Sequence, residues 1–266
     1  MSFFMHIEFL YVLLGVFSGF FSGLFGIGGG VVVVPALLAL FQTTALIPLG
    51  ERMAFAIGTS LAIMIFVSFA SVYSHHKLGE ILWVIVRRLW PGMCIGVILG
   101  SIGANYLPTD WLRIFFGLFL LFISWKMLFV KDASVARHFP SMLLHSIVTM
   151  GIGIFSGLLG IGGGTLLLSY LTYCGVELSR IPAISAVCSL LIALTGTLAF
   201  MLMSFQVHYH VPFSTGAIYW PAVFWVTLPS FVFAPIGARL TYHLPVKQLR
   251  YAFVSLLLMT AFDLLA

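Results

Sequence analysis

Residues 19–30 read GFFSGLFGIGGG, and residues 153–164 read GIFSGLLGIGGG. The two stretches lie 134 residues apart and differ only at Phe20/Ile154 and Phe25/Leu159. Two further pairs of landmarks follow in the same order: Thr59-Ser60-Leu61 with Cys188-Ser189-Leu190, and Leu107-Pro108 with Leu244-Pro245. Landmarks that return in the same order, about 130 residues apart, mark a duplicated structural unit. We therefore expect two halves, residues 1–134 and 135–266, within one membrane domain.

The composition around this repeat is that of a membrane protein. The chain has 266 residues, of which 62% are hydrophobic and only 7% are charged, and its mean hydropathy is +1.17. Soluble domains carry about a quarter charged residues, so a soluble enzyme, a disordered chain and a disulfide-stapled chain are excluded. The net charge of +5 we assign to basic residues in cytoplasmic loops rather than to nucleic-acid binding. The first residues, 1–14, lack a basic region and a cleavage pattern, so we expect no removed signal peptide.

Each half contains five apolar segments. They are residues 9–26, 31–47, 53–73, 89–106 and 111–130, then 142–160, 165–176, 182–204, 216–242 and 247–265. The glycine triplets separate the first two segments of each half, and residues 165–176 reach only about half-way across a bilayer at a rise of about 1.5 Å per residue. This pattern predicts an all-α integral membrane protein with helices broken at the glycine-rich motifs.

The distribution of basic residues decides between two topologies. If the two segments around each triplet return the chain to its starting side, ten basic residues fall on one side and two on the other. If those two segments together make one crossing, the count is six to six. The positive-inside rule favours the first arrangement, with both termini non-cytoplasmic, and an odd number of segments then inverts one half relative to the other, as in many secondary transporters. The ten cytoplasmic residues are Lys77, Arg87, Arg88, Lys126, Lys131, Arg137, Arg180, Arg239, Lys247 and Arg250, and the two others are Arg52 and Arg113.

The two triplets are the first candidates for a binding site. Consecutive glycines sustain a helix poorly, and backbone groups freed inside a membrane must be satisfied by protein, water or ligand. A helix that restarts after a break directs free N–H groups and a partial positive charge backward, which suits an anion. The alternative is that these glycines only allow close helix packing, as the spacing of Gly15, Gly19 and Gly23 and of Gly92, Gly96 and Gly100 suggests. The candidate glycines are Gly28, Gly29, Gly30, Gly162, Gly163 and Gly164.

Small polar residues near the breaks are the next candidates. Their hydroxyls can bind an oxyanion without the cost of burying a charge, although hydrogen bonding to their own helix is the commoner use. Arg52 and Arg180 begin the third segment of each half and can attract anions at two opposite mouths, or can simply reach the interface. The polar candidates are Ser22 and Ser156, before the triplets, and Thr59, Ser60, Cys188 and Ser189, within the third segments.

The remaining titratable residues predict no metal or cofactor site. The three cysteines lie in apolar stretches without a CxxC motif, so we interpret them as small buried residues rather than as metal or redox ligands. His75 and His76 are expected in a cytoplasmic loop, and His208 and His210 in an outer one. Asp263 is the only acid clearly inside an apolar segment. Pro221, Pro229 and Pro235 predict a kinked ninth segment.

The residues 22–30, their repeat at 156–164 and the Ala-Ile-Gly-Thr-Ser run at 56–60 resemble the sulfite exporter TauE/SafE family of membrane permeases. The resemblance covers essentially the whole chain, and the second half reads Val187-Cys188-Ser189 where the first has Thr-Ser. It implies transport of sulfite, organosulfonates or related sulfur-containing anions, by export.

The sequence thus predicts a secondary transporter of small anions in the bacterial inner membrane that works by alternating access between two inverted halves. An anion channel with the same central site is the alternative. An intramembrane enzyme would need a Ser/His or Asp/Asp pair inside the membrane, and the apolar segments offer none. With no nucleotide-binding cassette, the energy must come from an ion gradient, with protons as one candidate coupling ion, or from the gradient of the substrate itself.

Overall fold

The computed structural model describes residues 2–25, 29–44, 47–77, 81–129, 141–177, 180–203, 211–240 and 246–265. These residues form an all-α protein with one short hairpin. The helices of the first half are α1 (Ser2–Phe25), α2 (Gly30–Thr44), α3 (Arg52–Lys77), α4 (Trp83–Tyr106) and α5 (Thr109–Phe129). Those of the second half are α6 (Met142–Leu159), α7 (Gly164–Tyr173), α8 (Ile181–Met203), α9 (Trp220–Leu240) and α10 (Val246–Leu265), with strands β1 (Ser214–Thr215) and β2 (Ile218–Tyr219) before α9.

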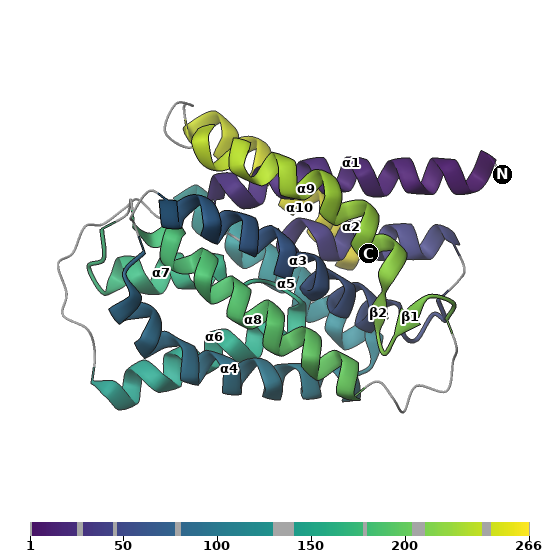
Figure 1. The fold of residues 1–266 in the computed structure, drawn as a ribbon. Coiled ribbons are helices and arrows are strands. Elements are labelled where there is room, and N and C mark those ends of the chain that lie inside the picture. Colours follow the sequence, from purple (N-terminus) through teal and green to yellow (C-terminus); the bar gives the residue numbers. More distant parts are fainter. Residues whose placement is uncertain are drawn as a thin grey trace.

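The most extensive helix pairs form across the two halves. In Figure 1, α1 and α9 lie along one edge, α4 and α6 along the opposite edge, and α3 and α8 between them. In addition, α3 contacts α9, α8 contacts α4, and α5 packs against α10. Helices α1 to α5 of the first half correspond in order to α6 to α10 of the second. If each helix is replaced by its counterpart, the α1–α9 pair becomes the α6–α4 pair, and the α3–α9 contact becomes the α8–α4 contact. The pairing therefore has the regularity that a duplicated unit produces.

Glycines make the two edge pairs possible. A Cβ atom on Gly96 of α4 would collide with the backbone of Met150, and one on Gly100 with that of Ile154, both in α6. On the other edge, a Cβ on Gly19 of α1 would lie 2.6 Å from the Ser230 carbonyl oxygen of α9. Small residues at four-residue spacing let helix backbones approach closely. The packing role expected from the spacing of these glycines is confirmed.

Among the described residues, five helices are long and apolar enough to cross a membrane. They lie within α3, α4, α6, α8 and α9, and α1 and α2 contain shorter apolar helices, Ile7–Gly23 and Gly30–Thr43. Large hydrophobic side chains such as Leu198, Leu202 and Phe224 are more than half exposed on the outer surface. A water-facing surface does not carry such a density of apolar side chains, whereas a surface that faces lipid does.

Several segment boundaries predicted from hydropathy were wrong, and α1 begins at Ser2 instead of residue 9. His75 and His76 lie in the last turns of α3 rather than in a loop, and His75 is buried. Arg87 and Arg88 lie within α4, which begins at Trp83 instead of residue 89. The ninth helix begins at Trp220, after the β1–β2 hairpin, instead of at residue 216. Hydropathy marks the part of a helix that contacts apolar surroundings, whereas backbone hydrogen bonding continues into more polar turns.

Candidate functional site

Each glycine break ends at a glycine whose backbone is in the left-handed conformation, and the next helix begins at the following residue. The φ angles are +76° at Gly29 and +65° at Gly163, a conformation that residues with a Cβ atom disfavour. The Val33 N–H then donates to the Gly29 carbonyl at 3.1 Å in α2, and the Leu167 N–H donates to the Gly163 carbonyl at 2.8 Å in α7. Because a glycine has no side chain with which to cap a helix, the first N–H groups of α7 lack the partner that a capping residue would supply.

The two breaks meet in space. A Cβ atom placed on Gly30 would lie 2.5 Å from the Gly160 carbonyl oxygen, 3.0 Å from the Ile161 Cα and 2.8 Å from the Met64 sulfur. Gly30 begins α2, whereas Gly160 and Ile161 form the segment between α6 and α7. The backbones of the first and second repeats are therefore in direct contact where their helices are interrupted.

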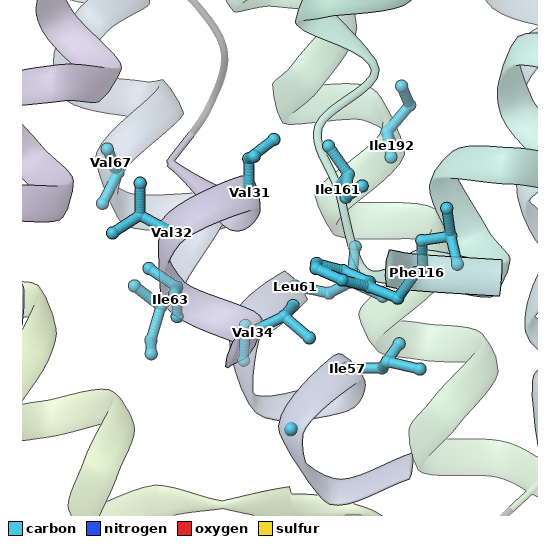
Figure 2. Close-up of a cluster of buried hydrophobic side chains, with 14 of the residues drawn as sticks. Val31, Val32, Val34, Ile57, Leu61, Ile63, Val67, Phe116, Ile161 and Ile192 are labelled. Carbon is cyan, nitrogen blue, oxygen red and sulfur yellow. The ribbon is translucent and has the colours of Figure 1, made fainter. Parts of the chain in front are cut away.

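Apolar side chains surround this meeting point. Figure 2 shows a buried cluster to which α2 contributes Val31, α3 contributes Leu61, α5 contributes Phe116 and the second break contributes Ile161. Each of these four side chains is at most 1% exposed. Electrostatic interactions gain strength where water is excluded, so backbone dipoles that point into such a region act on an anion more strongly than they would in water.

Ser22 and Ser156 lie beside the glycines that start the new helices. A Cβ on Gly29 would lie 3.5 Å from the Ser22 Cβ, and one on Gly163 would lie 2.9 Å from the Ser156 Oγ. The Ser156 hydroxyl donates to the Ile152 carbonyl at 2.7 Å, one turn earlier in α6. Both serines therefore lie at the breaks, as predicted, and the Ser156 proton is engaged by its own helix.

The predicted polar residues of the third segments hold the backbone of the second break. The Ser60 hydroxyl donates to the Gly160 carbonyl at 3.1 Å, and the Ser189 hydroxyl donates to the Gly162 carbonyl at 2.6 Å. Hydrogen bonds of this kind satisfy carbonyls that the interrupted helix leaves free. One of the two comes from α3, in the first half, so the two halves share the stabilisation of one break.

Thr59 and Cys188 have different surroundings. The Tyr219 backbone N–H donates to Thr59 Oγ1 at 3.0 Å, which ties α3 to the β1–β2 hairpin. Cys188 is fully buried and forms no disulfide. Cys188 therefore fills space beside Ser189, while Thr59 binds a neighbouring backbone.

The two arginines proposed as anion attractors are not brought to the breaks. The Arg52 Nε–H donates to the Ile47 carbonyl at 3.0 Å, and the exposed Arg180 pairs with Glu177 at 3.2 Å. Arg52 precedes Thr59 by seven residues, or roughly 10 Å along the helix axis. Both arginines lie at helix starts, where each is engaged by a nearby group. Of the six candidate glycines, Gly28 lies outside the described residues.

Thr165 is a residue of this region that the sequence reasoning missed. It occupies the second position of α7, its side chain is 7% exposed, and its hydroxyl has no hydrogen-bond partner among the described residues. Helical side chains lean toward the N-terminus of their helix, which here is the second break. The sequence did offer one signal for Thr165, because the two repeats differ here: the first half carries the apolar Val31 at the equivalent position.

Comparison with known proteins identifies the family. Residues 11–264 match the family model described as Sulfite exporter TauE/SafE. The chain belongs to the TauE/SafE family. It is therefore a multi-pass membrane transporter that works in a lipid bilayer and takes a small anion. The resemblance seen in the two glycine motifs is confirmed over nearly the whole sequence.

Relatives of this TauE/SafE chain carry matching names. A protein of Haemophilus influenzae named "Probable membrane transporter protein" is 33% identical over 256 residues, covering 96% of this chain and 97% of the relative. A probable membrane transporter protein of Methanocaldococcus jannaschii is 26% identical and covers 93% and 91% of the two chains. One from Bacillus subtilis is 27% identical over 59% of this chain and 64% of its own length. No solved structure matches the chain.

Proposed function

We propose that this TauE/SafE protein is a secondary transporter that exports sulfite, organosulfonates or related sulfur-containing oxyanions by alternating access. The anion is held between the two glycine breaks, by the first N–H groups of α2 and α7 and by nearby hydroxyls. The contact between Gly30 and the Gly160–Ile161 segment supports this site, because it brings the start of α2 against the second break, between α6 and α7. A helix start carries about half an elementary positive charge, enough for the loose binding that a carrier requires.

The halves, residues 1–134 and 135–266, act as inverted repeats in this proposal. The contacts of two glycines support it: Gly58 of α3 faces Phe200 of α8, and Gly196 of α8 faces Leu61 of α3. These contacts order α3 and α8 antiparallel, which is the relation that inversion requires of equivalent helices. Inverted repeats let one half rock against the other around a central site.

In the proposed topology both termini are non-cytoplasmic, and residues 131–141 form a cytoplasmic loop in the bacterial inner membrane. The return of α7 toward the start of α6 supports it, because Tyr170 of α7 hydrogen-bonds His145, four residues into α6. The two segments around the second triplet therefore bring the chain back to its starting side. Epitope tags at the C-terminus and in the 131–141 loop, probed with protease in right-side-out cells, test this arrangement. A protected C-terminus with an exposed loop would contradict it.

Binding titrations of sulfite to the purified protein test the site. We expect Gly163→Ala to lower sulfite affinity about tenfold, the equivalent of about 1.4 kcal/mol, because a Cβ would press on Ser156 and strain a backbone with φ of +65°. Gly151→Ala in α6 is the matched control, since a Cβ there meets no atom within 4 Å. Unchanged affinity in a monodisperse Gly163→Ala variant would mean that the breaks only pack helices.

Electrical recordings separate the carrier from the channel, because a channel passes far more ions per opening.

A further inference from the structure

A buried polar cluster links α6 to α7 at the ends remote from the second break. His145 of α6 is 5% exposed and Tyr170 of α7 is 9% exposed. The His145 Nδ1 and the Tyr170 hydroxyl oxygen lie 2.5 Å apart in a hydrogen bond, and their rings are 5.6 Å apart. This contact joins the two helices that flank the Gly160–Gly163 segment, so a change in it acts on their relative position.

Charged and titratable neighbours approach this pair from two other directions. Arg88 of α4 interacts with His145 both through its backbone and through its charge. The Cys174 side chain, just after α7, hydrogen-bonds Tyr170. The other helices packed on α6 are α5 and α8; α5 carries Lys126 in its last turn, and Arg180 precedes α8. Of these basic residues, Arg88 is the one that interacts electrostatically with His145 among the described residues.

The first half has no counterpart of this cluster. At the offset of 134 residues that the two glycine motifs define, His145 corresponds to Tyr11, Tyr170 to Ala36, and Arg88 on α4 to Ala222 on α9. A tyrosine with an ordinary pKa near 10 does not titrate around neutral pH, whereas a histidine does. A residue type whose ordinary pKa lies near neutrality thus stands at this position in one half only.

From this geometry we propose that His145, with Tyr170 as its hydrogen-bond partner, binds the proton that couples transport to a proton gradient. The inference rests on the proposed carrier function and names its coupling ion. In the neutral state the Tyr170 hydroxyl donates to Nδ1. A proton that binds Nδ1 reverses this bond, since N–H then donates to the tyrosine oxygen and the hydroxyl proton turns toward Cys174.

Protonation also changes the forces between the helices. A charged His145 faces the positive Arg88, and like charges at short range repel each other. The repulsion is relieved when α6 and α7 shift relative to α4 or when an anion enters. Proton binding at one end of the α6–α7 unit therefore biases the glycine break at its other end, where the transported anion is proposed to bind.

Proton binding is tested without transport by NMR of purified protein labelled at histidine. The signal of His145 is identified as the one that is missing from the spectrum of the His145→Gln variant. We expect it to titrate between about pH 5 and pH 8, and Tyr170→Phe to move its midpoint by about half a pH unit. An unresponsive His145 signal across that range would overturn the proposal. If Tyr170→Phe leaves the midpoint of the His145 titration unchanged, Tyr170 is not part of the proton site.

Transport is tested with sulfite in proteoliposomes, by counterflow without a pH gradient and by uptake with one. We expect the gradient to stimulate uptake by the wild type several-fold, and His145→Gln to lose this stimulation while keeping counterflow within about twofold, because it removes the proton and not the anion site. His76 is an exposed histidine at the end of α3, and the control variant His76→Gln should keep both the stimulation and the counterflow. Stimulation that survives in His145→Gln would refute proton coupling at this site. Absent counterflow in the wild type would instead refute the carrier proposal, and the NMR titration would still decide whether His145 binds a proton.

Discussion

Gly30, the first residue of α2, packs directly against the carbonyl of Gly160, the residue that ends α6. These glycines belong to different repeats, and no Cβ atom fits between them. The contact fixes the start of α2 against the end of α6. A movement that separates the two glycine breaks would have to open this contact.

Gly30→Ala should abolish sulfite counterflow. Its Cβ would lie 2.5 Å from a backbone oxygen and 3.0 Å from the Ile161 Cα, and neither atom can yield as the end of a flexible side chain does. Overpacking of this kind costs about 1–3 kcal/mol. Counterflow in proteoliposomes and thermal unfolding in detergent measure the two effects, and normal counterflow would show that the breaks need not touch.

Ser60→Ala and Ser189→Ala should each destabilise the protein. Each removes a donor from a carbonyl of the second break, Gly160 or Gly162, and an unsatisfied buried acceptor costs about 1–3 kcal/mol. Ser74→Ala is the matched control, because the Ser74 hydroxyl bonds only to Ala70 of its own helix. Thermal unfolding in detergent should rank both break variants below this control. Equal unfolding temperatures would mean that water or other groups replace the serines.

Thr165→Val should weaken anion binding without destabilising the fold. The substitution preserves shape and removes a hydroxyl that is buried without a partner among the described residues. Such a hydroxyl costs free energy in the empty protein and gains a hydrogen bond when an oxyanion arrives. We expect sulfite affinity to fall about several-fold while thermal stability stays equal or rises. An unchanged affinity would exclude Thr165 from the site.

Gly96→Ala should mainly reduce stability. Its Cβ would collide with the Met150 backbone across the α4–α6 interface, remote from the glycine breaks. Gly103→Ala is the control, because the Cβ there meets only the flexible end of Leu158, at 3.4 Å. Thermal unfolding should separate the two variants, with sulfite affinity retained in the protein that remains folded. A selective loss of affinity would mean that this interface contributes to the site.

Glu51→Gln should stabilise the protein at neutral pH. Burial raises the pKa of the Glu51 carboxyl, which precedes α3, and its Oε2 has no hydrogen-bond partner among the described residues. A raised folded-state pKa means that the ionised form is disfavoured on folding, so the penalty is present at neutral pH and disappears as the pH falls through the raised pKa. The gain from Gln should therefore shrink in acid. Thermal unfolding at neutral and acidic pH measures it, and a gain independent of pH would contradict this cause.

The sequence alone determined the class of fold, the ten helices seen in the described residues and the two breaks. Apolar runs long enough to cross a bilayer are set by local composition, and consecutive glycines disfavour a helix through their own low helix propensity. The 134-residue repeat likewise follows from identity between residues 19–30 and 153–164. The small spacing of Gly96 and Gly100 predicted a packing face, since a helix places such residues on one side.

Only the tertiary structure decided which groups meet. Nothing in the sequence places Ser60 on the Gly160 carbonyl, which lies 100 residues away and in the other repeat. The pairing of His145 with Tyr170 was also hidden, because neither residue belongs to a motif and only the return of α7 along α6 brings them together. Helix formation depends on neighbours along the chain, whereas these contacts depend on how whole helices pack, and the repeat gives no local signal for that arrangement.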